Sequence, residues 1–234
     1  MNLFDLCKAI KIQNEDPLDT DATFDDFFED EEAADIILSI NSVNNSICNS
    51  NDWNFREAKT TFQTVIAEDE YTKPFGKIWK MKHEGQVTPL GEIHYDYIID
   101  YPQTGTPYNY SFYADKLILY PTPTEVKTVT AYYYTNYFAK SINESSEIVD
   151  TSSLANGTDY SIIPVHLHDI LIYGACIEHY KKPSREKSIL WQARFEQLMT
   201  DFENACKNSV NDYKRVVFGE RPQDIIQDFF DPRK

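Results

Sequence analysis

An unbroken apolar run, Ile-Leu-Ile-Tyr-Gly-Ala-Cys-Ile, extends from Ile170 to Ile177. A helix that is apolar on all sides is buried inside a protein or an assembly. The run is far too short to cross a bilayer, and polar residues such as Asp169 and Glu178 flank it. The pattern therefore predicts a buried helix at the centre of the molecule.

The residues around this run predict an antiparallel helical hairpin, with arms at residues 165–181 and 184–208. Pro164 suits a first helical turn, Pro183 ends the first arm, and Ser184 is a good N-cap for the second. Apolar residues three and four apart give the second arm one stripe: Trp191, Phe195, Leu198, Phe202 and Ala205. The predicted helical core is Ile170, Leu171, Gly174, Ala175, Trp191 and Phe195, with Gly174 allowing close approach of another helix.

Two further helical patterns occur near the N-terminus. Leu3–Ile12 has an apolar face of Leu3, Leu6, Cys7 and Ile10. Ala33–Cys48 has a stripe of Ile36, Ile37, Ile40, Val43 and Ile47. Both patterns predict amphipathic helices.

The acidic segment between these helices, Glu15–Asp35, contains eleven acidic residues and no basic one. Phe24, Phe27 and Phe28 interrupt the run of charge. Two interpretations stay open: a solvated or partly disordered segment, and a docking segment anchored by its aromatic side chains.

The period of the pattern changes after Trp53 from helical to alternating. Strands are predicted within residues 53–66 and at residues 75–81, 86–93, 110–113, 116–120 and 126–137. Glu84-Gly85 and the stretches 102–105 and 121–123 mark turns. Residues 145–159 look like a polar connector.

These elements predict an α+β fold, in which a helical bundle built from both termini carries an inserted antiparallel β domain. The expected domains are residues 1–52 for the N-terminal helices with their acidic insert, 53–150 for the β-rich domain and 160–210 for the hairpin. The hairpin and the N-terminal helices are expected to form one helical domain.

Composition narrows the function. The chain of 234 residues is 41% hydrophobic, which is typical of a globular protein, and its net charge of −16 argues against a protein that grips nucleic-acid phosphates with a basic face. Cys7, Cys48, Cys176 and Cys206 form no CxxC pair and are expected to be free, buried thiols. Neither a signal peptide nor a membrane span is expected, so we predict assembly in a cytoplasm.

No catalytic constellation stands out, and no catalytic residue, cofactor or metal is predicted. His166 and His168 diverge at a helix start, and Glu178-His179 has no second histidine at helical spacing. The Tyr-rich strands leave one alternative of another class, a glycan- or partner-binding β module with a helical extension. A hydrolase with an unrecognised carboxylate site is a weaker alternative.

The C-terminal tail, residues 211–234, carries five basic and five acidic residues and is too broken by Gly and Pro for a core helix. We predict an extended tail that docks on a partner or a neighbouring copy through Phe218, Arg221, Ile225, Ile226, Phe229 and Phe230. A tail folded back on its own subunit is the alternative.

An ordered set of short stretches resembles the head-to-tail adaptor proteins of tailed bacteriophages, especially short-tailed ones. The stretches are Asp52-Trp53-Asn54-Phe55, the strand and Pro-x-Pro turn at 115–123, Ala131-Tyr132-Tyr133-Tyr134, the hairpin opening at 163–171, Gly174-Ala175 and Trp191. Together they cover roughly Ala33 to Asn208, and the acidic insert departs from the family's pattern.

The resemblance implies a structural virion protein and not an enzyme. The family forms a ring, expected here to have twelve copies, beneath the portal protein at the virion neck and above a downstream tail or nozzle protein. Genomic DNA would pass through the ring without specific binding, because acidic walls repel phosphates.

Overall fold

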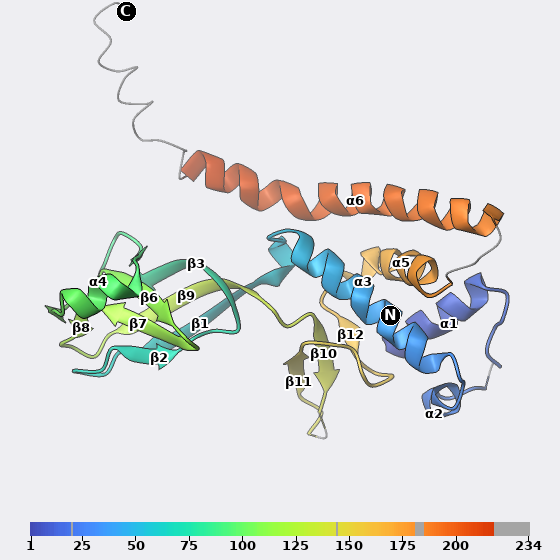
Figure 1. Ribbon diagram of the computed structural model, residues 1–234, viewed down its shortest axis with the longest axis horizontal. Helices are drawn as coiled ribbons and strands as arrows, with labels where there is room; N and C mark the ends of the chain where they lie inside the picture. The colour runs from blue at the N-terminus through green and yellow to red at the C-terminus, as the bar shows by residue number, and fades with distance from the viewer. Residues whose placement is uncertain (20, 144, 181–184, 218–234) are drawn as a thin grey trace, which may run out of the picture. The chain divides into compact units, whose positions relative to one another are not determined.

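The computed structural model shows a mixed α+β protein and describes residues 1–19, 21–143, 145–180 and 185–217 (Figure 1). The described α-helices are α1 Leu3–Gln13, α2 Phe24–Phe28, α3 Ala33–Ser50, α4 Tyr95–Asp100, α5 Asp169–His179 and α6 Arg185–Val217. The longer strands are β1 Glu57–Gln63, β3 Gly76–His83, β6 Asn109–Tyr113, β7 Lys116–Tyr120, β9 Thr128–Thr135, β10 Ala139–Ile142 and β11 Ile148–Thr151. Shorter elements are β2 Glu70–Thr72, β4 Gly91–Glu92, β5 Thr104–Gly105, β8 Thr122–Pro123, β12 Tyr160–Ser161 and the 3-10 turns Asn54–Arg56 and Val165–Leu167.

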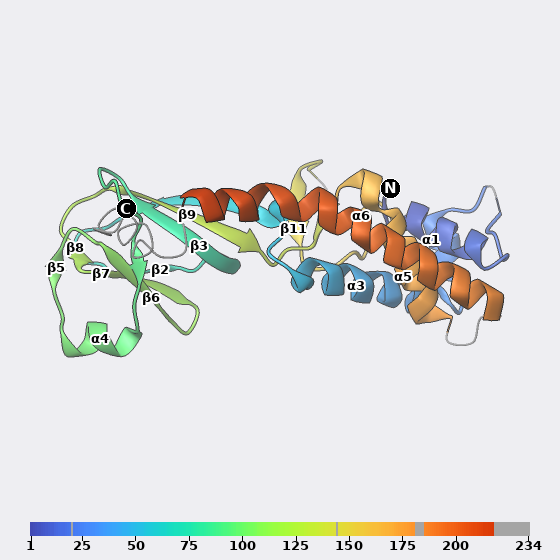
Figure 2. The ribbon, with the colours of Figure 1, turned by 90° about the horizontal axis from the view of Figure 1, so that it is seen from above.

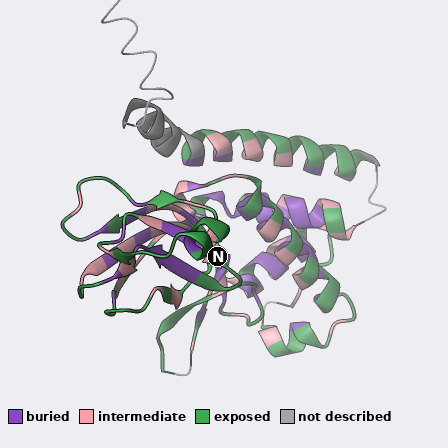
Figure 3. Cartoon of the chain, turned by 60° about the vertical axis from the view of Figure 1, so that its left-hand side comes forward, coloured by how far each residue is buried: buried purple, intermediate pink, exposed green. Residues whose placement is uncertain are grey.

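The chain forms two compact units. The β unit comprises Met1–Asp5, Asn44–Asp52 and Arg56–Ile163, and the helical unit comprises Leu6–Val43, Trp53–Phe55 and the chain from Pro164 onward. Figure 3 shows that buried residues concentrate inside the units, whereas the outer side of α6 is exposed.

Helices α5 and α6 lie side by side in the helical unit (Figures 1 and 2). Six residues of α5 are buried: Ile170, Leu171, Ile172, Gly174, Ala175 and Cys176. A Cβ atom on Gly174 would lie 2.6 Å from Cγ1 of Val43 in α3 and 3.0 Å from Cε2 of Phe195 in α6. Glycine is therefore required where these three helices meet, because even one methyl group would force a neighbour to move.

The predicted amphipathic helices are confirmed as α1 and α3. Leu3, Leu6, Cys7 and Ile10 have no solvent exposure, and Ile36, Ile40, Val43 and Ile47 are buried, with Ile37 half-buried. On α6, Trp191 and Phe202 are buried, Phe195 and Leu198 are half-buried, and Ala205 is exposed. All four cysteines are free and buried, as predicted.

Two antiparallel sheets enclose the core of the β unit. One has the strand order β1-β9-β3, and the other, β2-β7-β6-β4, adds the two-residue strand β4 in parallel. The core residues between them are Ile78, Met81, Leu90, Tyr110, Leu117, Leu119, Val129 and Ala131. A third sheet has the order β11-β10-β12, and β5 pairs with β8 in parallel over two residues.

The structure corrects three predictions and adds one helix that the pattern did not predict. Residues 86–93 form a strand only at Gly91–Glu92, since Pro89 has no N–H for a ladder. Tyr95–Asp100 forms helix α4, begun by His94, whose ring accepts a hydrogen bond from the N–H of Asp96. The connector at 145–159 contains strand β11. Helix α6 continues to Val217, so residues 211–217 are helical and not extended.

Candidate functional site

The residues predicted for the helical core lie on two packed helices. Four of these residues are at most 1% exposed: Ile170, Leu171, Ala175 and Trp191. Phe195 packs against Gly174. The predicted docking residues of the tail, Phe218, Arg221, Ile225, Ile226, Phe229 and Phe230, lie outside the described residues.

A buried lysine holds the acidic segment onto the helical unit. Lys11 on α1 is 2% exposed, and its Nζ lies 2.7 Å from Asp30, 2.9 Å from Asp16 and 3.4 Å from Glu32. We call these four residues the Lys11 cluster. A buried ammonium is stable only when charged partners replace its water, and three carboxylates of the acidic segment do so here.

Two members of the Lys11 cluster, Lys11 and Asp30, have pKa values shifted in favour of their charged forms. Burial alone would lower the pKa of Lys11, but hydrogen bonds and attraction from Asp30 and Asp16 outweigh it and raise the pKa. The hydrogen bond from Lys11, together with the N–H of Glu32, lowers the pKa of Asp30. The cluster is therefore an ion pair network at neutral pH.

The middle of the acidic segment forms the short helix α2. Thr23 and Asp26 make a capping box, with the Asp26 N–H donating to Oγ1 of Thr23 and Asp26 accepting from the Thr23 N–H. Phe27 is 1% exposed, whereas Phe28 is 59% exposed and lies beside Phe24, with ring centroids 5.9 Å apart. Most described residues of the segment are exposed, in keeping with a solvated segment, while Phe27 and the Lys11 cluster hold parts of it in place. Its outer carboxylates, Asp21, Asp25, Asp26, Glu29 and Glu31, are exposed.

A face of the β1-β9-β3 sheet gathers lysines that are far apart in sequence. Lys59 of β1 and Lys80 of β3 are both cross-strand neighbours of Tyr132 on β9. In the next row, Thr61 and Lys82 flank Thr130. Cross-strand neighbours share one face of a sheet, so these six residues form one surface, which we call the lysine face.

The lysine face combines charge with aromatic rings. Nζ of Lys80 lies 6.0 Å from the ring centroid of Tyr132 and 5.9 Å from that of Trp79, the residue at the bulge in β3. Lys59 and Lys82 are exposed, and within the described part of the chain neither forms an ion pair. At one margin of this face, Lys77 pairs with Asp52 at 2.8 Å.

The lysine face is a functional candidate that sequence reasoning missed. The sequence suggested no concentrated basic face, because Lys59, Lys80 and Lys82 are separated by up to 23 positions and pair only through β9. The alternation Lys80-Met81-Lys82-His83 signalled that both lysines face away from the core. It did not show that Lys59 joins them.

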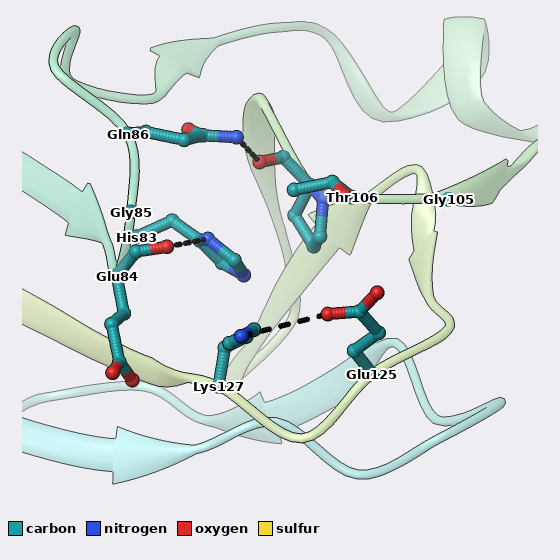
Figure 4. A pocket seen from close by; sticks show the side chains of 9 residues that line it. His83, Glu84, Gly85, Gln86, Gly105, Thr106, Glu125 and Lys127 are labelled. Atoms are coloured by element: carbon teal, nitrogen blue, oxygen red, sulfur yellow. Dashed lines mark hydrogen bonds and ion pairs between the residues drawn. The ribbon is translucent and has the colours of Figure 1, made fainter.

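A small polar pocket lies at one end of the β unit, with a volume of about 210 Å³ (Figure 4). His83, on its wall, is 4% exposed, and its Nδ1 lies 2.9 Å from the carbonyl oxygen of Glu84. Glu125 pairs with Lys127 at 3.6 Å, and Glu84 accepts the N–H of Thr128 at 2.9 Å. Both carboxylates therefore already have partners, which gives the pocket a structural explanation.

The described residues lack two further features. No group of three or more His, Cys, Asp or Glu side chains there is placed to hold a metal ion. Within the same residues, no helix has the length and apolar character that a membrane crossing requires.

Comparison with known proteins gives one family. The family model described as SU10 adaptor protein matches residues 1–216, which include both units and the acidic segment. No curated protein matches the chain.

Proposed function

The chain belongs to the SU10 adaptor protein family, a family of structural bacteriophage adaptors, and we propose that it forms a head-to-tail adaptor ring beneath the portal. The match over residues 1–216 carries this proposal, since it includes nearly the whole chain. The resemblance seen in the sequence, between Ala33 and Asn208, agrees with that family. In the proposed assembly, twelve copies at the virion neck join the portal above to a tail or nozzle protein below.

We propose that the helices from both chain ends form one bundle in each ring subunit. The close contact of Gly174 with Val43 and Phe195 supports this, because it joins α3 of the N-terminal half to α5 and α6. The glycine at this contact lets the three helices pack closely, which suits a structural component of a ring.

In the proposed ring, the acidity of the chain keeps DNA from binding to the channel wall. A chain with a net charge of −16 adds a repulsive wall around the genome, so DNA slides without sticking. The purified chain should therefore not retain duplex DNA in a gel-shift assay at physiological salt. Tight binding that weakens steeply with salt would contradict the role proposed for the charge.

The tail is proposed as the partner-docking element. Phe218, Arg221, Ile225, Ile226, Phe229 and Phe230 lie beyond residue 216, where the family match ends. A segment outside the shared family region is suited to contact a partner specific to one phage. Truncation after Val217, where α6 ends, should leave the melting of the chain unchanged and reduce co-assembly with the portal. Normal co-assembly would show that the tail does not dock.

The ring itself is tested by co-expressing the chain with the portal protein of the same phage. Native mass spectrometry and electron microscopy should show a closed ring of adaptor copies on the portal, assembled in the bacterial cytoplasm. A monomer that never binds the portal, together with saturable binding of an oligosaccharide, would favour the glycan-binding alternative instead.

A further inference from the structure

We propose that each ring contact joins the lysine face of one copy to the outer side of the acidic segment of the next copy. This inference rests on the proposed ring and adds the residues that would join neighbouring copies. Lys59 and Lys82 would pair with exposed carboxylates around Asp25 and Glu29, and Phe28 would pack beside Tyr132.

A ring of acidic subunits needs local attraction at its contacts. Copies with a net charge of −16 repel one another wherever their surfaces meet without complementary charge. A ring also repeats one head-to-tail contact, in which two different patches of the same chain meet. The chain must therefore carry a pair of unlike, complementary patches.

The two patches match in both charge and apolar character. Neither row of the lysine face contains an acidic residue, and Lys59 and Lys82 are exposed. The acidic segment contains no basic residue, and the Lys11 cluster uses only three of its eleven carboxylates. Phe28, 59% exposed on α2, provides an aromatic group for the rings of Tyr132 and Trp79. Aromatic residues framed by charge are typical of interface centres.

The same face is less suited to nucleic acid. It offers three lysines, whereas stable binding of duplex DNA commonly involves about 6–10 phosphate contacts. Glu57 and Glu84 lie at the two ends of the same sheet and would repel a phosphate backbone that continued past it.

Charge reversal tests the contact. The variant Lys59→Glu/Lys82→Glu should lower the fraction of chain in rings by about tenfold or more, since like charges brought together cost several kcal/mol. The variant Asp25→Lys/Glu29→Lys should do the same. The control Lys116→Glu/Lys140→Glu changes the net charge equally, outside both patches, and should form rings as the wild type does. Lys116 and Lys140 form exposed pairs with Glu70 and Asp150, so their loss should not unfold the chain.

Mixing the two reversed variants gives the decisive result. Each carries the patch that the other needs, so rings should return with the two variants alternating. A wild-type yield of rings from each charge-reversed variant tested alone would overturn the contact. A loss of rings that mixing the two variants does not restore would also overturn it. Loss of DNA retention by Lys59→Glu/Lys82→Glu, with unchanged rings, would assign the face to nucleic acid.

A second measurement separates this contact from the ring proposal. Wild-type chain is prepared in ¹⁴N and ¹⁵N forms, mixed, and treated with a carbodiimide that joins lysine directly to carboxylate. Cross-linked peptides of mixed label between Lys59 or Lys82 and residues 21–31 would support the contact even if no ring forms on the portal. Peptides of single label only would place the interaction within one chain and overturn the proposal.

Discussion

Two buried cations, Lys11 in the helical unit and Arg56 in the β unit, are 2% and 5% exposed, yet their partners are of opposite kinds. Lys11 is surrounded by three carboxylates. Arg56 donates to the carbonyl oxygens of Cys48, Asn51 and Thr135 and to the Asn136 side chain. Burial lowers the pKa of Arg56, whereas carboxylates raise that of Lys11.

The two cations stabilise different parts of the chain. Carbonyl groups at the end of α3 lack helical partners, and the guanidinium of Arg56 satisfies them while joining that end to β9. The ammonium of Lys11 attracts three carboxylates of the acidic segment that would otherwise repel one another. One contact is between a cation and backbone dipoles, and the other is between opposite charges, so acid should affect only the second.

Replacing Arg56 should give the largest loss. Arg56→Ala leaves several carbonyl oxygens near the α3 end without donors and opens a cavity, so we expect a loss of about 3–5 kcal/mol in unfolding free energy. Urea denaturation of the full chain measures it, and hydrogen exchange should show lost protection at the end of α3 and along β9. A loss below about 1 kcal/mol would mean that water replaces the guanidinium.

Lys11→Met should cost less, about 1–3 kcal/mol, because Asp16 and Glu32 are largely exposed and regain water when the ammonium is removed. Hydrogen exchange should rise in the acidic segment and stay unchanged in the β unit. Lys140→Met is a matched control on an exposed pair and should cost less than about 1 kcal/mol. Equal effects of the two variants would contradict a special role for Lys11.

Gly174→Leu tests the apolar contact of α5 with α3 and α6. The added side chain would collide with Val43 and Phe195, so we expect a loss of about 1–3 kcal/mol. Ala193→Leu, at an exposed position of the same helical pair, should leave the melting temperature nearly unchanged. An unchanged melting temperature for Gly174→Leu would show that α5 can move away from α3.

The smallest effect should be the pH dependence that Asp30 of the Lys11 cluster contributes to stability. The pKa of Asp30 is lowered in the folded chain, so its contribution is present above the ordinary aspartate pKa of about 4 and is lost as the pH falls through the folded value. Asp30→Asn should therefore destabilise at pH 7, by about 1 kcal/mol, and cease to differ from wild type in strong acid. The effect of Arg56→Ala should stay constant over the same range, and a parallel decline of both would end the distinction.

Much of the helical unit could be predicted from local pattern. Period and capping residues placed α1, α3 and α5 within a few residues, because apolar stripes and Pro or Ser boundaries act within one helix. The β unit was harder to predict. Gln86–Ile93 alternates like a strand but lies mostly outside a ladder, and Tyr95–Asp100 contains β-prone aromatics yet forms α4. Tertiary contacts decide such short segments, because their intrinsic preferences are weak.

Sequence alone determined the apolar faces, the free thiols, the acidity of Glu15–Asp35 and the family of the chain. Only the tertiary structure decided that Lys11 would hold this acidic segment and that Lys59, Lys80 and Lys82 would share a face. Periodicity specifies which side of an element a residue occupies. The residues that come to lie beside it are set by strand register and by the burial of charge, both of which join positions far apart in the chain.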